Sequence, residues 1–421
     1  MRPTVSFSIR HFLFQSLGEP FQGLPRTFWY LWLGTLVNSL GALVLPFLGL
    51  YLVQQRGFDI SVAGLVVAGY GAGSFVAAPL GGWLADRLGR RRTLMLALFS
   101  ASAAMLTLST MHSLWGLAVT VAVLGLCTDL GRPSTTALLA DVVPPADRVR
   151  AYGVLYLAFN LGLAIATALG GLLARTSFFW LFVGDAATTF CFGLWVVWKI
   201  PETHPDAQAA VRPPAQDSGA WRDGALLAFC LLGFFNFCVV FQSFGMLPLA
   251  MAARGLAPSI FGGVIALNGV LIVVAQPFLS RWVVRFPRAR VMAASSFLFG
   301  LGFMLCAWAR TPLEYAGTVV VWTLGEMGAA PVANAIVADL APRHARGRYQ
   351  GVYFMAIGSA LFAGPALGGL VMQHLGSTAL WLGCGAMGTV SALGHLLIAP
   401  ARRERMRLLR SVDAQVLLSA D

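Results

Sequence analysis

Long apolar runs separated by short polar stretches fill most of this 421-residue chain. A helix needs about 20 apolar residues to cross a hydrocarbon core of roughly 30 Å, and runs of that length recur. The first run is longer than the apolar part of a signal peptide and lacks a small-x-small cleavage site, so we expect it to be retained. The pattern predicts twelve spans, with approximate limits 27–54, 60–84, 93–110, 114–141, 151–174, 178–199, 223–252, 259–284, 291–308, 313–338, 348–373 and 378–399.

Composition supports a membrane protein. Only 11% of the residues are charged and the mean hydropathy is +0.75, whereas a soluble domain carries about a quarter charged residues. The net charge of +12 does not indicate nucleic-acid binding, because most arginines lie in short loops between spans. The six cysteines form no CxxC and no Cys/His spacing, so we expect neither a disulfide framework nor a metal or other cofactor.

The arginines also predict the orientation of the spans. One alternating set of loops holds Arg56, Arg175, Arg254 and Arg310, while the other set and the two tails hold Lys199 and 23 of the 28 arginines. Positively charged loops stay in the cytoplasm, so we expect both termini there, in a multi-pass protein of the inner (cell) membrane. The single lysine among so many arginines favours a bacterial source.

The chain repeats itself at an interval of 198 residues. "ALLADVVPPADRVRAYGVLY" (137–156) aligns with "AIVADLAPRHARGRYQGVYF" (335–354), and the register continues without a gap in both directions. The aligned pairs include Asp141 with Asp339, Arg90 with Arg288, and Asn38 with Asn236. This similarity indicates an internal duplication of a six-span unit.

A polar stretch with several prolines, 201–221, separates the two halves and has the composition of a linker. We therefore divide the chain into a cytoplasmic N-terminal segment, two bundles with a linker between them, and a cytoplasmic tail: 1–26, 27–199, 200–222, 223–399 and 400–421. Two similar bundles joined in this way suggest a central site that opens to each side in turn. The alternative is a static scaffold or receptor built from duplicated helices.

The stretch "GGWLADRLGRRRTL" (81–94) closely resembles motif A of the major facilitator superfamily, GxLaDrxGrkxxl. The second-half copy keeps its basic residues but has Val284 where Asp86 would stand. The resemblance implies an all-α membrane protein with twelve transmembrane helices in two pseudo-symmetric six-helix bundles. It also implies a cytoplasmic gate, in which Asp86 faces the positive end of span eleven and the arginines pair with Asp141. The candidate gate residues are Gly82, Asp86, Arg87, Gly89, Arg90, Arg91 and Asp141.

Other stretches resemble the twelve-span drug:proton antiporter branch of that superfamily. "NSLGALVLPFLGLYL" in span one is similar to its proline-containing motif, and "PET" follows span six. Span five departs from the antiporter motif gxxxGPxxGG, because Ala166-Thr167 replaces Gly-Pro, whereas span eleven keeps Gly364-Pro365. This departure leaves the direction of transport open.

Charged residues inside the spans are the candidate chemistry, since a charge there is costly unless it is paired or hydrated. Asp129 and Arg132 lie in span four and share a helix face, and Glu326 lies in span ten. We expect Glu326 and Asp129 to couple transport to protons, and Asp129 and Arg132 to bind substrate. The alternatives are a static Asp129–Arg132 pair and a structural buried Glu326; Asp185, nearer the outer surface, reads as structural. Further candidates for substrate binding, which could equally serve helix packing, are Asn38, Tyr70, Asn160, Asn236, Gln242 and Asn268.

These features predict a proton-coupled secondary active transporter that works by alternating access and exports drugs or other small molecules. The alternative is a proton-coupled importer of polar or zwitterionic solutes such as short peptides, although span one lacks the ExxER signature of the proton-dependent peptide family. An enzyme is not expected, because GxSxG and HExxH are missing and the six histidines are isolated. The expected partners are a small-molecule substrate, protons and the bilayer, with the chain acting as a monomer.

Overall fold

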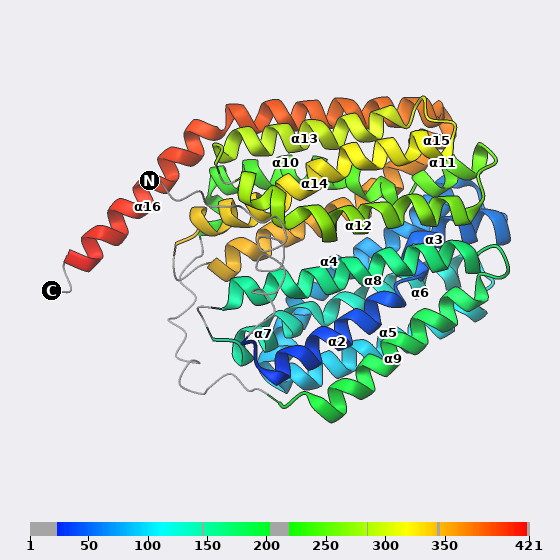
Figure 1. The fold of residues 1–421 in the computed structure, drawn as a ribbon, viewed down its shortest axis with the longest axis horizontal. Helices are drawn as coiled ribbons and strands as arrows, with labels where there is room; N and C mark the ends of the chain where they lie inside the picture. Colours follow the sequence, from blue (N-terminus) through cyan, green and yellow to red (C-terminus); the bar gives the residue numbers. More distant parts are fainter. Residues whose placement is uncertain (1–22, 145–146, 203–218, 284, 343–345, 419–421) are drawn as a thin grey trace, which may run out of the picture.

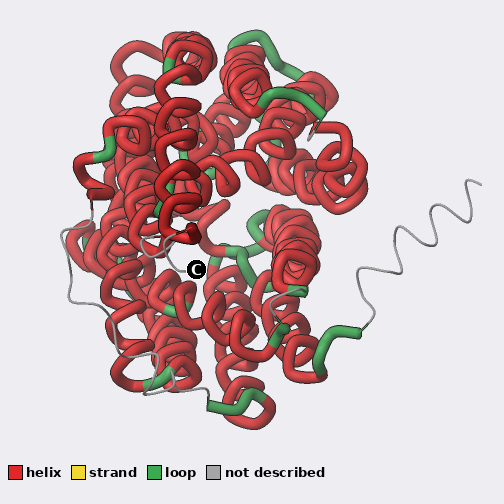
Figure 2. Tube along the Cα trace, turned by 90° about the vertical axis from the view of Figure 1, so that its left-hand side faces the viewer, coloured by secondary structure: helices red, strands yellow, loops and turns green. Residues whose placement is uncertain are grey.

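The structure is a computed structural model that describes residues 23–144, 147–202, 219–283, 285–342 and 346–418. Over these residues the chain forms helices and loops, without a strand (Figure 2). Eleven of the described helical segments are long and apolar enough to cross a membrane. The last of them, Tyr349–Leu397, has 49 residues, more than twice the length of about 20 that one crossing needs.

That last segment is two helices. It belongs to α15 (Arg346–Leu397), in which Gly376 has φ 86° and ψ 165°, outside the helical region. A residue with a side chain rarely adopts such a φ, whereas glycine does so without steric cost. Spans eleven and twelve of the sequence prediction therefore lie on either side of Gly376, and the all-α fold with two six-span halves is confirmed.

The first half runs from α2 to α9. Its elements are α2 (Arg26–Leu40), α3 (Val44–Leu50), the π-helical turn η2 (Tyr51–Gln55), α4 (Ile60–Leu88), α5 (Arg90–Thr110), α6 (Leu114–Leu130), α7 (Arg132–Val142), α8 (Arg148–Leu173) and α9 (Phe179–Lys199). The second half contains η3 (Gly219–Arg222), α10 (Gly224–Val240), η4 (Phe241–Ser243), α11 (Leu247–Ala253), α12 (Pro258–Val283), α13 (Arg288–Leu305), α14 (Pro312–Leu340), α15 and α16 (Ala399–Leu418).

Three spans predicted as continuous helices are broken. Span one is interrupted at 41–43, span four at Gly131, and span seven between α10 and α11. The first break is stabilised from another helix, because Asp185 of α9 accepts hydrogen bonds from the backbone N–H groups of Leu43 (3.1 Å) and Val44 (3.0 Å). A helix start in lipid must satisfy its free N–H groups within the protein, and Asp185 does so for α3.

The segment predicted as a cytoplasmic tail forms the helix α16. Its first turns contact the second half: Arg405 Nε donates to Asp223 Oδ2 at 2.8 Å, and the Tyr349 hydroxyl donates to the same oxygen at 2.9 Å. Asp223 also caps α10 by accepting from the N–H groups of Ala225 and Leu226. Burial alone would raise the pKa of Asp223, but these hydrogen bonds outweigh it and hold the pKa below its ordinary value.

Two ends of the bundle can be distinguished in Figure 1. The basic end, at the left, carries the loop between α4 and α5, the start of α10 and the projecting α16. The opposite end, at the right, carries α3 and α11. The halves meet mainly through α4 packed on α15, α8 on α12, and α3 on α11.

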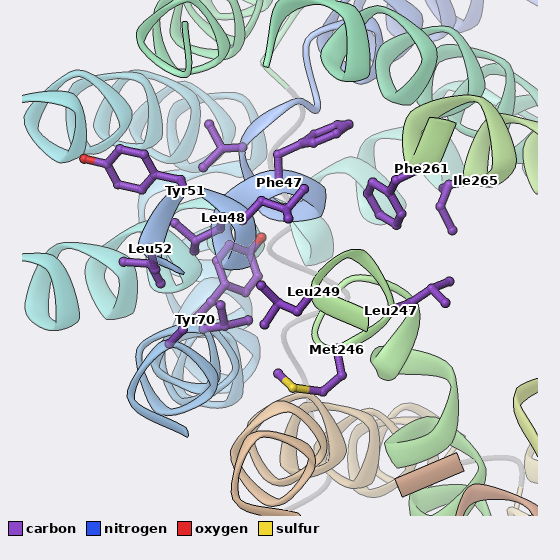
Figure 3. Packing of buried hydrophobic residues seen from close by; sticks show 14 of the residues in the cluster. Phe47, Leu48, Tyr51, Leu52, Tyr70, Met246, Leu247, Leu249, Phe261 and Ile265 are labelled. Atoms are coloured by element: carbon purple, nitrogen blue, oxygen red, sulfur yellow. The ribbon is translucent and has the colours of Figure 1, made fainter. Parts of the chain in front are cut away.

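The buried apolar residues show that the halves are joined at the opposite end. One cluster there combines residues of both halves, among them Phe47, Leu48, Met246, Leu249 and Phe261 (Figure 3). The rings of Phe47 and Phe261 meet edge to face with their centroids 5.4 Å apart. At the basic end each half has its own cluster, one around Phe28 and Leu139 and one around Phe229 and Tyr349. The described core is thus shared at the opposite end and divided at the basic end.

Candidate transport site

Glu326 lies near the middle of α14 and is held by a residue of the neighbouring helix α12. Asn268 Nδ2 donates to Glu326 Oε2 at 2.8 Å and also lies 3.0 Å from the Thr323 hydroxyl oxygen. Asn268 is buried and Glu326 is partly buried. Among the residues that the structure describes, no arginine, lysine or histidine forms an ion pair with Glu326. Its carboxylate is therefore held by a neutral amide.

The other half of the protein approaches the same acid through α8. Tyr156 lies within electrostatic range of Glu326, and Asn160, one turn further along α8, donates to the Tyr156 carbonyl oxygen at 2.9 Å. Asn160 packs against α12 at Gly269, the residue next to Asn268. Glu326 thus lies close to the contact between the two halves.

Asp129 has a different environment. It ends α6 just before the break at Gly131, and Arg132 Nε, at the start of α7, forms an ion pair with Asp129 Oδ1 at 2.7 Å. The Ser74 hydroxyl of α4 donates to the second carboxylate oxygen, and Tyr70, one turn earlier, lies within electrostatic range of both charges. The Asp129 side chain is 5% exposed and that of Arg132 is 69% exposed, so the acid is enclosed while the guanidinium is open.

The two acids occupy related places in the repeat. Tyr70 and Asn268 differ by 198 positions, as do Thr128 and Glu326. In the first half, Tyr70 of α4 lies within electrostatic range of Asp129 in α6. In the second half, Asn268 of α12 donates to Glu326 in α14. The difference between the halves is that the acid carries a cationic partner in the first half and a neutral one in the second.

The remaining polar candidates do not gather around these acids. Asn236 donates to the Ser296 hydroxyl at 2.8 Å, and Gln242 donates to the carbonyl oxygens of Cys238 (3.1 Å) and Gly364 (2.8 Å). These bonds join α10 and η4 to α13 and α15. In this structure both residues therefore serve helix packing, the alternative to substrate binding that the sequence left open. Asn38 is half-buried, and its side-chain oxygen has no hydrogen-bond partner in the described part of the chain.

The motif at 81–94 forms the turn between α4 and α5. Gly89, with φ 95°, separates the helices, and Glu202 accepts from the free N–H groups of Arg91 (2.9 Å) and Arg92 (3.2 Å) at the start of α5. A negative charge at a helix N-terminus is favourable. Glu202 belongs to the "PET" stretch after span six, and its role as a cap was not predicted.

The expected arginine–carboxylate contact is present in this motif. Arg90 forms an ion pair with Asp141, and its repeat mate Arg288 pairs with Asp339. Arg87 stacks on the Trp83 ring at 4.5 Å. A β-carbon on Gly82 would meet nothing within 4 Å, and the halves have separate cores at this end. The side chain of Asp86 lies outside the described residues.

A family model described as the Major Facilitator Superfamily matches residues 31–250 and 229–418, one match for each half. The chain belongs to the major facilitator superfamily. It is therefore a multi-pass membrane transporter and not an enzyme.

Three bacterial proteins illustrate the similarity of this chain to known sequences. An uncharacterized MFS-type transporter, YttB of Bacillus subtilis, is 27% identical over 369 residues, covering 85% of this chain and 91% of the relative. The multidrug resistance protein MdtH of Escherichia coli is 24% identical, covering 83% and 89%. A Na(+), Li(+), K(+)/H(+) antiporter of Planococcus maritimus is 24% identical, covering 74% and 81%.

Solved structures agree on the fold. A POT family transporter in complex with a thioalcohol-conjugated peptide has a TM-score of 0.78 at 17% identity, covering 92% of this chain and 99% of that one. The nucleoside transporter NupG has a TM-score of 0.74 at 14% identity, covering 89% and 100%. At such identities the likeness concerns the major facilitator fold alone.

Proposed function

We propose that this chain exports small, cationic organic molecules from the cytoplasm in exchange for protons. The proposal places the basic end in the cytoplasm, as the arginine distribution predicts, and the protein in the inner membrane. Because both halves of the site come from one chain, we propose that a monomer is the working unit.

The observation that carries the proposal is the contrast between the two acids. Asp129 is already neutralised by Arg132 at 2.7 Å, whereas Glu326 has the neutral Asn268 as its partner. A carboxylate in a poorly hydrated place favours neutralisation by a proton or a nearby cation. Glu326 can therefore hold either a proton or a cationic substrate, but not both, which is the requirement for exchange.

The arrangement of the cores supports the direction of loading. The halves share a core at the opposite end and have separate cores at the basic end, which supports access to the site from the basic end in this state. A cation arriving from the cytoplasm would displace the proton from Glu326. After the halves rock, a proton from outside would displace the cation, since the proton gradient favours protonation there. In this scheme Asp129 and Arg132 help to select the substrate.

The relatives support export without deciding it. One is a multidrug resistance protein and one is an antiporter that exchanges alkali cations for protons. Both descriptions fit a site in which a proton and a cation compete for one carboxylate.

The test is reconstitution into liposomes with an imposed pH gradient and a fluorescent lipophilic cation as substrate. We expect gradient-driven uptake or release of the cation that Glu326→Gln abolishes. Exchange of the cation without a gradient should be lost as well, because the cation and the proton compete for this carboxylate. Glu404→Gln, which changes an exposed acid of α16, is the matched control and should behave as the wild type. Gradient-driven flux that survives Glu326→Gln unchanged would contradict the proposal.

One observation favours a second candidate, proton-coupled import of a zwitterion. The Arg132 guanidinium is 69% exposed, so it can bind a substrate carboxylate while Glu326 binds the substrate amine. In the same liposomes, uptake of di- and tripeptides along an inward proton gradient, lost in Arg132→Gln, would select this candidate over export of cations.

A further inference from the structure

Two of the contacts that join the halves, α8 on α12 and α4 on α15, are glycine contacts related by the repeat. On the α8–α12 contact, a β-carbon on Gly269 would lie 2.6 Å from the Ala164 β-carbon and 2.8 Å from the Asn160 carbonyl oxygen. On the α4–α15 contact, a β-carbon on Gly71 would overlap the backbone of Leu361 and Phe362. Gly71 and Gly269 differ by 198 positions. At both places the two halves approach each other backbone to backbone.

A second pair of glycines continues each contact toward the opposite end. Gly64 lies against Gly369 and Gly262 lies against Gly171, and Gly64 and Gly262 are again repeat mates. The seam between α8 and α12 therefore runs over two turns, with Gly262 toward the opposite end and Gly269 near mid-depth. We call these two contacts, at Gly64 and Gly71 and at Gly262 and Gly269, the glycine seams.

Each glycine seam is directly connected to a buried acid. The residue before Gly269 is Asn268, whose side chain donates to Glu326 at 2.8 Å. The residue before Gly71 is Tyr70, which lies within electrostatic range of Asp129 and Arg132. Consecutive helical residues point about 100° apart, so one short stretch of α12 touches the other half with its backbone and the acid with its side chain.

Building on the function proposed above, we propose that the Asn268–Gly269 pair couples closure of the opposite end to the state of Glu326. When α8 and α12 are in contact at Gly269, Asn268 is positioned to donate to the Glu326 carboxylate. When the seam opens, α12 moves relative to α14 and this hydrogen bond is weakened, so the carboxylate becomes a better acceptor for a proton. Asn268 is in this sense a positioning residue for Glu326.

The groups around Glu326 allow this coupling to be tested cleanly. From α12 the acid meets the neutral side chain of Asn268, which also bonds to the Thr323 hydroxyl of α14, and from α8 Tyr156 lies within electrostatic range of it. Among the described residues, Tyr156 is the titratable group that faces it. Changes in the pH response of the seam can therefore be traced to Glu326 by a Glu326→Gln variant, with Tyr156→Phe to exclude the phenol.

The first experiment measures opening of the seam without any transport. Thr167 is fully buried on α8, with its backbone against Gly262. The exposed Cys191 is first replaced by serine, and Thr167→Cys is introduced into this background. The protein in detergent is labelled with a hydrophilic thiol reagent. Its labelling rate is normalised to that of the denatured chain at the same pH. We expect Gly269→Ala to raise this rate about fivefold or more, the lower range of typical coupling energies.

The matched control is Gly263→Ala on the same helix, where a β-carbon would meet nothing within 4 Å; its labelling rate should equal that of the parent. If Gly269→Ala and Gly263→Ala label alike, the seam does not hold the opposite end closed and the proposal is wrong. Should Gly269→Ala fail to fold, the reciprocal measurement below decides.

The second experiment uses reciprocity, since coupling between two sites must act in both directions. The labelling rate of Thr167→Cys should depend on pH, and Glu326→Gln and Asn268→Ala should each remove most of that dependence. A pH response that survives in both variants overturns the link between seam and acid. Because no gradient or substrate is present, this result is independent of flux. If the labelling rate depends on pH through Glu326 and Asn268 but the wild-type protein shows no proton-driven flux, only the proposed function is overturned.

Discussion

Asp185 and Val44 are joined by a 3.0 Å hydrogen bond across 141 positions of the chain, in which the α9 carboxylate caps the second part of span one. The same oxygen accepts from Leu43 at 3.1 Å. Asp185 thus differs from Asp129 and Glu326, two other acids within the spans, because it accepts from backbone groups of a helix start.

This difference predicts a structural phenotype for Asp185. Asp185→Ala leaves two N–H groups unpaired in an apolar place and should lower the free energy of unfolding by about 2–4 kcal/mol. Thermal unfolding in detergent measures this loss. Asp185→Asn keeps one acceptor and should lose less than half as much, and the pH profile of transport should be that of the wild type in every variant that folds. A displaced pH profile would assign Asp185 to the coupling machinery instead.

The ion pair of Arg90 with Asp141 predicts an effect on rate more than on stability. The pair is partly exposed, so its contribution to stability should be about 1 kcal/mol or less. If it supports the gate at the basic end, Asp141→Arg should reduce the transport rate several-fold and the exchanged pair Arg90→Asp with Asp141→Arg should restore part of it. The repeat mate offers the control. Asp339→Arg disturbs the pair with Arg288 in the half that has Val284 in place of Asp86, and it should reduce the transport rate less. Equal losses in both halves would show that the pairs only shape the loops.

Gly89 predicts a local conformational cost. Its φ of 95° is unfavourable for a residue with a side chain, and a β-carbon would lie 2.7 Å from the Glu202 carboxyl carbon. Gly89→Ala should therefore destabilise the fold by about 1–2 kcal/mol and loosen the cap on α5. Gly153→Ala, in an open position of α8, should be neutral or slightly stabilising because alanine favours helices. Thermal unfolding of the two variants side by side makes the comparison.

Asp223 predicts how the attachment of α16 responds to pH. The folded pKa of Asp223 is below the ordinary value of about 3.9. Its contribution to the free energy of unfolding is therefore complete above about pH 3.9 and is lost as the pH falls through the folded pKa. Wild type and Asp223→Asn should differ by about 1–3 kcal/mol in unfolding free energy at pH 6, and the difference should shrink below about pH 4. Arg405→Leu should reproduce the loss at pH 6. A difference that stays constant down to pH 3 would contradict the assignment.

Much of the site was predictable because charge in a membrane helix is rare. Asp129, Arg132 and Glu326 stood out from apolar surroundings, and the interval of 198 residues aligned Arg90 and Asp141 with Arg288 and Asp339. Sequence could not show that Asn268 holds Glu326 or that Ser74 holds Asp129. Those contacts depend on the rotation of each helix about its axis, which side-chain packing sets and which hydropathy does not record.

The missed features share a cause, which is dependence on a distant partner. Nothing around Gly41 shows that a helix will stop there, because the cap that allows the stop is Asp185. Glu202 is an exposed acid in a linker until α5 is placed beside it. For α16 a local signal does exist, since residues 401–410 are alanine, arginine, glutamate, methionine and leucine, all strong helix formers.

The shared core at the opposite end has a thermal consequence. The surfaces that meet there are chiefly apolar and include Phe47 of the first half and Leu249 of the second. A hydrogen bond from the Ser61 N–H to Gln373 Oε1 at 2.8 Å joins the start of α4 to α15 just before its break at Gly376. Exposing that apolar surface to water raises the heat capacity. The equilibrium between the two rocked states should consequently follow a curved van't Hoff plot, with cooling reducing the penalty for exposing this end.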